Sequence, residues 1–153
     1  MMIETTTGLF TVAVFQDADW AAKALDALKQ AGFPLEGLSV IVKDTPAASA
    51  LVEKTFGSGG ERLELREMGA VIAHGPLVAA LQGSARDLTT LGLAGTMRRV
   101  GFQAHDGRIF ETLTGRGGVL VAIRSEPRAA DALALFHSYG GGNAAIGAWS
   151  GRI

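Results

Sequence analysis

Few residues in this sequence combine a reactive side chain with the spacing that chemistry requires. His105 and Asp106 are neighbours, and an imidazole with an orienting carboxylate can act as an acid–base group. Adjacent residues rarely aim their side chains at each other, however, whereas a carboxylate at a helix start accepts backbone N–H groups and opposes the helix dipole. The sequence therefore favours Asp106 as a helix cap and leaves acid–base chemistry at His105 as the alternative.

Two arginines, Arg98 and Arg99, end a predicted helical segment. Cations stabilise a helix C-terminus because they face the negative end of its dipole, so a structural role is the simpler interpretation. The alternative is an anion site, because a guanidinium group binds phosphate or carboxylate through paired hydrogen bonds.

The remaining histidines, His74 and His137, stand apart from each other, and neither has a metal-ligand spacing such as i, i+4. The chain has no cysteine, which excludes disulfides, thiolate catalysis and Cys-based zinc sites. We expect no metal, no cofactor and no catalytic residue of a known motif. The candidate ligand-binding residues are His74, Arg98, Arg99, His105 and Asp106.

The composition excludes several classes of partner. A length of 153 residues corresponds to about one domain. Because 14 Lys+Arg stand against 15 Asp+Glu, no long-range field concentrates nucleic acid around the protein, and no nucleic acid is expected as a partner. The N-terminal residues lack the basic and apolar regions of a secretion signal, and the absence of cysteine suits a reducing compartment, so we expect a cytoplasmic protein.

The longest apolar stretch, residues 68–81, is shorter than the ~20 residues of a membrane-spanning helix. Gly75 and Pro76 interrupt it, which predicts a turn followed by a helix starting near Pro76. It contains no lysine or arginine, which the polar face of an interfacial helix uses. We expect this stretch to be buried in the fold, and membrane association is not expected.

Periodicity predicts a strand over residues 8–14, a helix and a second strand over residues 38–42. The strand alternation places apolar residues on both of its faces. The helix is opened by Asp17 or Asp19 and ended by Gly32. Its apolar face consists of Ala21, Ala24, Leu25 and Leu28.

The C-terminal third repeats this pattern at a nearly constant offset, so that Gly117 and Val121 correspond to Gly8 and Val12, and Leu133 corresponds to Leu25. The second unit has a strand from residue 117, a helix after Pro127 and a closing strand over residues 144–149. Two β-α-β halves predict a single α+β domain (residues 1–153) with a ferredoxin-like, four-stranded antiparallel sheet and both helices on one face. The halves are residues 8–44 and 117–149.

Between the halves, residues 45–116 form a mostly helical insertion. Helices are predicted over residues 46–56, with Thr45 as cap, and over residues 76–82, 84–100 and 106–114. Residues 62–67 alternate as a short strand. The insertion or a second subunit must cover the apolar second face of the sheet, and this favours a homodimer or larger homo-oligomer.

Six stretches resemble the bacterial general stress protein family of the YflT type, also described as heat-induced or general stress protein 17M-like. They are VAVF (12–15), ALDAL (24–28), AGFP (31–34), GPLVAAL (75–81), RRVGF (98–102) and RGGVLV (116–121). The resemblance implies a stress-related role without assigned catalytic residues. Many relatives carry a long membrane-seeking middle segment, which here is short and broken by Arg86 and Asp87.

Three functional hypotheses follow. The first is a non-enzymatic, stress-associated protein that self-associates and binds a small ligand or a protein partner. The second is an enzyme with a site between the inserted helices and the sheet, built from His74, His105 or Asp106 with Arg98 or Arg99. The third is a stress protein attached peripherally to membrane through residues 68–81.

Overall fold

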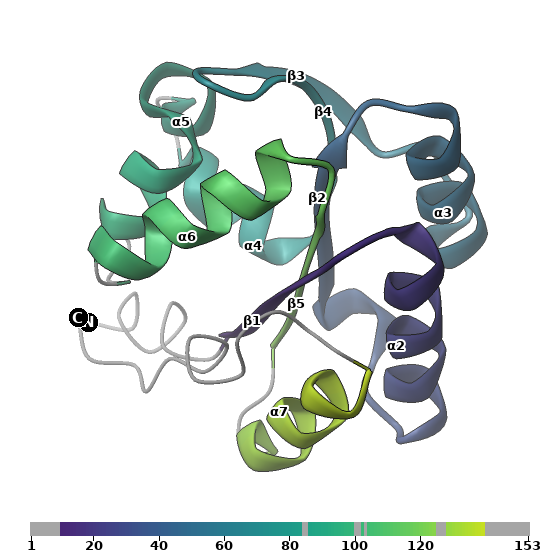
Figure 1. Cartoon of the computed structure of the whole chain (residues 1–153). Coiled ribbons are helices and arrows are strands. Elements are labelled where there is room, and N and C mark those ends of the chain that lie inside the picture. The colour runs from purple at the N-terminus through teal and green to yellow at the C-terminus, as the bar shows by residue number, and fades with distance from the viewer. Residues whose placement is uncertain (1–9, 84–85, 100–101, 103, 125–127, 140–153) are drawn as a thin grey trace.

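The structure, a computed structural model, describes residues 10–83, 86–99, 102, 104–124 and 128–139 (Figure 1). Its centre is an open antiparallel sheet whose described strands follow the order β1-β5-β2-β4-β3. The strands are β1 (Phe10–Phe15), β2 (Leu38–Lys43), β3 (Glu61–Leu65), β4 (Gly69–His74) and β5 (Val119–Arg124).

Helices cover both faces of this sheet, as Figure 1 shows. One face carries α2 (Ala18–Gln30), α3 (Pro46–Phe56) and α7 (Ala129–Ser138), and a short 3-10 turn, η1 (Leu35–Gly37), precedes β2. The other face carries α4 (Pro76–Gln82), α5 (Asp87–Arg99) and α6 (Ala104–Gly115). The described chain is therefore a three-layer α/β/α arrangement, and inserted helices, not a second subunit, cover the second sheet face.

Strand alternation divides the core into two clusters, as the sequence predicted. Phe10, Val12 and Val14 of β1 pack with α4, α5 and α6. Ala13 and Phe15 face the other way and pack with α2, α3 and α7. Successive side chains of a strand point to opposite faces, so a strand with apolar residues on both of its faces needs cover on both sides. Residues 8 and 9 of the predicted strand lie outside the described residues.

The first half has the predicted split β-α-β connection. Strands β1 and β2 run in the same direction, and β5 lies between them, antiparallel to both. Helices α2 and α7 lie on the same sheet face, as expected for two equivalent halves. The closing strand predicted over residues 144–149 and the side chain of Leu133 lie outside the described part of the chain.

The prediction of a four-stranded ferredoxin-like sheet is wrong. Strand β4 pairs with the outer edge of β2 and carries β3 with it, so the described sheet has five strands. The apolar run that forms β4 alternates between the two clusters, with Val71 and Ala73 on one side and Ile72 on the other. The strand predicted over residues 62–67 ends earlier, at Leu65, because Glu67 adopts φ 72° in the β3–β4 turn.

Local capping chemistry determines where the helices begin. Asp17 Oδ1 accepts a hydrogen bond from Trp20 N (3.0 Å) at the start of α2. Thr45 Oγ1 accepts one from Ala48 N (3.1 Å) at the start of α3. Both side chains pair backbone N–H groups that the first helical turn leaves without partners, and both confirm predicted helix starts.

Most of the apolar stretch of residues 68–81 is buried, as predicted, and Ala70 and Ala79 are its exposed residues. It forms β4 and α4, and Met68, Val71, Leu77 and Leu81 are each at most 5% exposed. Among the described residues, no helix is both long and apolar enough to cross a membrane.

Helix α6 contains one buried polar atom that predicts a stabilising substitution. Within the described part of the chain, Thr114 Oγ1 is the one wholly buried side-chain oxygen or nitrogen without a hydrogen-bond partner. Because an unpaired buried hydroxyl costs its full desolvation, Thr114→Val should raise the free energy of unfolding by about 1 kcal/mol. Urea unfolding measures this change.

The matched control is Thr96→Val in α5. Thr96 is equally buried, but its Oγ1 donates to the carbonyl oxygens of Gly92 (2.9 Å) and Leu93 (3.2 Å). Its substitution should lower the free energy of unfolding by about 1 kcal/mol. A loss of stability in Thr114→Val would show that its hydroxyl has a partner in solution.

Candidate functional site

The candidate residues predicted from sequence do not converge on one site. His74 ends β4, Arg98 and Arg99 end α5, and His105 and Asp106 lie in the first turn of α6. Helix α6 begins at Ala104, before the predicted start, so Asp106 lies inside the helix and is not its cap. His105 is solvent-exposed, and its Nδ1 lies 3.8 Å from Asp106 Oδ1, beyond hydrogen-bonding distance.

The side chain of Arg99 is held by contacts within the fold. Its Nη2 donates to the carbonyl oxygens of Ala80 (3.3 Å) and Leu81 (2.7 Å), near the C-terminal end of α4. Its Nε lies 3.1 Å from Asp87 Oδ2. The end of a helix leaves carbonyl groups unpaired, and a guanidinium group with several donors can pair two of them and a carboxylate together. Arg98 is exposed, and the described residues give it no such partner.

This difference predicts unequal effects of two neighbouring substitutions. Arg99→Ala should lower the free energy of unfolding by about 1 kcal/mol, a value discounted because the side chain is partly exposed. Arg98→Ala should leave stability unchanged. Urea unfolding of both variants measures the difference, and equal losses would contradict the structural role of Arg99.

A surface hollow of about 480 Å³ opens where β4 meets α4, and we call it the β4–α4 hollow. Its volume lies within the range of ~300–1,000 Å³ common for small-molecule sites. His74 is the one sequence-predicted candidate that lines it. The polar lining includes Ser58, Glu61, His74, Gln82 and Arg86.

Two glycines allow segments that line this hollow to pack closely against the sheet. Gly60 has φ 73°, and a Cβ there would lie 3.0 Å from Ile72 Cγ2. Gly75 has φ 113°, and a Cβ there would overlap the Leu38 carbonyl oxygen and lie 2.5 Å from Ser39 Cα. Only glycine combines this backbone conformation with such contact. The α3–β3 loop and the β4–α4 junction are therefore held tightly against the sheet.

Ser39 completes the β4–α4 junction from the neighbouring strand. Gly75, the residue before α4, has no side chain with which to cap the helix. The Ser39 hydroxyl in β2 instead accepts a hydrogen bond from Leu77 N (2.9 Å), and Ser39 is fully buried. Because one hydroxyl joins β2 to the first turn of α4, the position of the hollow depends on the sheet itself.

The side-chain amide of Gln82, a residue that lines the hollow, is oriented by a backbone hydrogen bond. Its side chain is about nine-tenths buried, and its Oε1 accepts a hydrogen bond from Leu88 N (3.0 Å). Because a backbone N–H can only donate, the amide oxygen must face Leu88, and Nε2 faces the other way. Nε2 has no partner among the described residues and is not fully enclosed. Nε2 therefore remains accessible to solvent, and Gln82 is one of the residues that line the hollow.

Two of the residues that line the hollow, Glu61 and Arg86, form an ion pair. Glu61 Oε2 on β3 lies 3.9 Å from Arg86 Nη2, and both side chains are more than half exposed. Arg86 has φ 55°, a conformation that few non-glycine residues adopt. Such backbone is retained where the surrounding structure requires it, and functional sites are enriched in it.

The ring of His74 lies against Phe56 of α3, with 4.2 Å between ring centroids and 38° between ring planes. This contact holds the imidazole at the edge of the hollow. Within the described part of the chain, no three histidine, aspartate or glutamate side chains come together as a metal site. The arrangement can therefore bind a polar molecule through a carboxylate, a guanidinium group, an amide and an imidazole.

Comparison with known proteins gives no relative from which a function could be inferred, so the geometry of the hollow is the basis for the functional proposal. No protein-family model, no curated protein and no solved structure matches the chain. Gln82, Glu61 and Arg86 belong to no motif, so sequence patterns did not select them. The signals present in the sequence were Gly75–Pro76 and the glycine run of residues 57–60, which mark the two turns that form the hollow.

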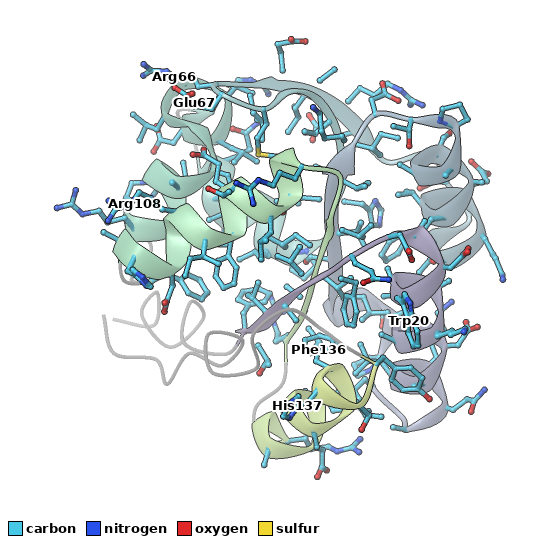
Figure 2. The ribbon with its side chains drawn as sticks, viewed as in Figure 1. Trp20, Arg66, Glu67, Arg108, Phe136 and His137 are labelled. Atoms are coloured by element: carbon cyan, nitrogen blue, oxygen red, sulfur yellow. The ribbon has the colours of Figure 1, made fainter. Side chains whose placement is uncertain are left out.

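A second hollow of about 410 Å³ lies between the start of α2 and the end of α7, beside Trp20, His137 and Tyr139. Figure 2 shows Trp20 and His137 on these two helices. Below it, Phe136 packs edge-to-face on Phe15 with ring centroids 5.7 Å apart. Its rim reaches Tyr139, the last described residue, so the β4–α4 hollow is the better-defined candidate.

Proposed function

We propose that this chain is a non-enzymatic, stress-associated bacterial protein of the cytoplasm that binds a small polar molecule in the β4–α4 hollow. The stress-related role and the location rest on the resemblance to the YflT-type family and on composition. The binding role rests on one observation: Gln82 is about nine-tenths buried, lines the hollow and has an unpaired Nε2 donor. An acceptor group of a bound ligand can replace solvent as the partner of this donor.

The dispersion of the sequence-predicted residues supports binding over catalysis. An acid–base group must reach its partner within hydrogen-bonding distance. His74 lines the β4–α4 hollow, whereas His105 belongs to a separate shallow depression on α6 and Arg99 is engaged by α4. The enzyme hypothesis would therefore need a different set of residues.

Self-association is a separate proposal, because both faces of the described sheet are already covered. A second copy would have to use helix surfaces, where Trp20 and Leu91 are large apolar side chains with 38% and 45% exposure. Light scattering at micromolar concentration measures the mass directly.

The binding proposal is tested by filling the hollow. Ala79 is exposed and lines it, so Ala79→Phe should occupy the space without disturbing the core. A library of polar metabolites is screened by saturation-transfer NMR against the wild-type protein and this variant. We expect at least one compound to bind the wild type and to lose binding in Ala79→Phe. The control is Ala50→Phe, at an exposed position of α3 away from the hollow.

The outcomes separate the hypotheses. Binding that survives Ala79→Phe, or an absence of binding across the library, would contradict the proposed site. A compound recovered chemically changed after incubation would support the enzyme hypothesis instead. Flotation of the protein with anionic liposomes, resistant to high salt, would support the membrane hypothesis.

A further inference from the structure

The charges of the β4–α4 hollow indicate the class of its ligand, and this inference rests on the proposed function. The described lining contains one acidic residue, Glu61, and one arginine, Arg86, together with His74. An anion that approaches Arg86 also approaches the Glu61 carboxylate, and a cation that approaches Glu61 also approaches the guanidinium group. Because attraction and repulsion then act at similar distances, a singly charged ligand gains little electrostatic binding free energy.

The existing ion pair can be opened at low cost. Its closest atoms are 3.9 Å apart, and the Arg86 and Glu61 side chains are 63% and 53% exposed. Exposed pairs of this kind contribute little to stability. A ligand with one positive and one negative group can separate the two side chains and give each a shorter, hydrogen-bonded partner.

The uncharged residues of the lining would orient such a ligand in the hollow. Gln82 carries a free Nε2 donor and Arg86 a guanidinium group, and both residues line the hollow, so one ligand carboxylate can accept from both. Val78 and Ala79 provide an apolar wall beside them. A short aliphatic side chain of the ligand would contact these two residues while the ammonium group of the ligand faces Glu61.

We propose that the hollow binds a free α-amino acid with a small aliphatic side chain. The carboxylate pairs with Arg86 and Gln82, the ammonium group pairs with Glu61, and the side chain lies on Val78 and Ala79. The two charged groups of an α-amino acid are attached to one carbon, which matches two protein charges that lie close together in the lining of the hollow.

The experiment is a titration of the ¹⁵N-labelled full chain, followed by NMR, with three compounds that share one branched four-carbon skeleton. L-valine carries both charges, isovalerate lacks the ammonium group and isobutylamine lacks the carboxylate. We expect saturable shifts of the amide signals of residues 58–61, 73–75 and 78–83 with L-valine, and binding of the two truncated compounds that is weaker by about tenfold or more. Isovalerate offers no partner to Glu61, and isobutylamine offers no partner to Arg86.

Conservative variants locate the two contacts. Glu61→Gln and Arg86→Gln should each weaken L-valine binding by about tenfold, whereas the exposed controls Glu64→Gln and Arg98→Gln should bind L-valine as the wild type does.

If isovalerate or isobutylamine binds the hollow as tightly as L-valine, the zwitterion inference is overturned while the proposed binding function stands. If none of the three compounds shifts these signals, the amino-acid inference also fails, and the metabolite screen with Ala79→Phe decides separately on the binding function.

Discussion

Gly75→Ala should unfold the protein or lower its free energy of unfolding by more than about 4 kcal/mol, an exceptional cost for one methyl group. The backbone at Gly75 has φ 113° and ψ 174°, a region that essentially only glycine occupies. An added Cβ would also overlap the Leu38 carbonyl oxygen and lie 2.5 Å from Ser39 Cα. These are backbone atoms of β2, so no side-chain rotation can relieve the overlap.

Relief would instead require α4 to move away from β2. That movement would break the hydrogen bond from Leu77 N to Ser39 Oγ and expose Leu77 and Leu81, which are fully buried. Urea unfolding measures the loss, and the soluble yield reports a variant that does not fold.

Gly57→Ala separates the two causes of this loss. Gly57 has φ 75° at the end of α3, and a Cβ there would meet no atom within 4 Å. Its substitution should cost about 1–2 kcal/mol, the penalty for placing an ordinary residue in the left-handed region. If the two variants lost similar stability, the close contact between Gly75 and β2 would be refuted.

The starts of α2, α3 and α4 were predictable from sequence because they depend on local chemistry. Thr45 and Pro46 define the start of α3 within its own first turn, and Pro76 does the same for α4. The capping hydrogen bond of Thr45 joins residues three positions apart. No distant residue is needed to form such a bond, so the pattern is visible in any single sequence.

Strand β4 was not predicted because its identity depends on a distant partner. A short apolar run such as residues 69–74 is compatible with a buried helix or a buried strand. Pairing with β2, in the register Val40 to His74, decides between them. The number of strands, and with it the four-stranded expectation, therefore depended on a long-range contact that leaves no periodic signal.

The candidate site shows the same limit. His74 was selected by residue type and does line the β4–α4 hollow. Glu61, Gln82 and Arg86 have ordinary surface side-chain types, and they meet only because the β3–β4 hairpin joins the sheet beside α4. The predicted pair His105 and Asp106 had suggestive chemistry, but α6 points the imidazole into solvent.

Leu25→Ala should lower the free energy of unfolding by about 2–5 kcal/mol, the range for truncation of a buried leucine. Leu25 is 1% exposed on α2 and belongs to the cluster between the sheet and α2, α3 and α7. The matched control is Leu91→Ala, at a leucine with 45% exposure, which should change stability by less than about 0.5 kcal/mol.

The duplicated sequence pattern predicts that Leu133→Ala lowers the free energy of unfolding by as much as Leu25→Ala does. Urea unfolding of the three variants tests packing and duplication separately: a neutral Leu25→Ala would refute the assigned face of α2, and a neutral Leu133→Ala would refute the equivalence of the two halves.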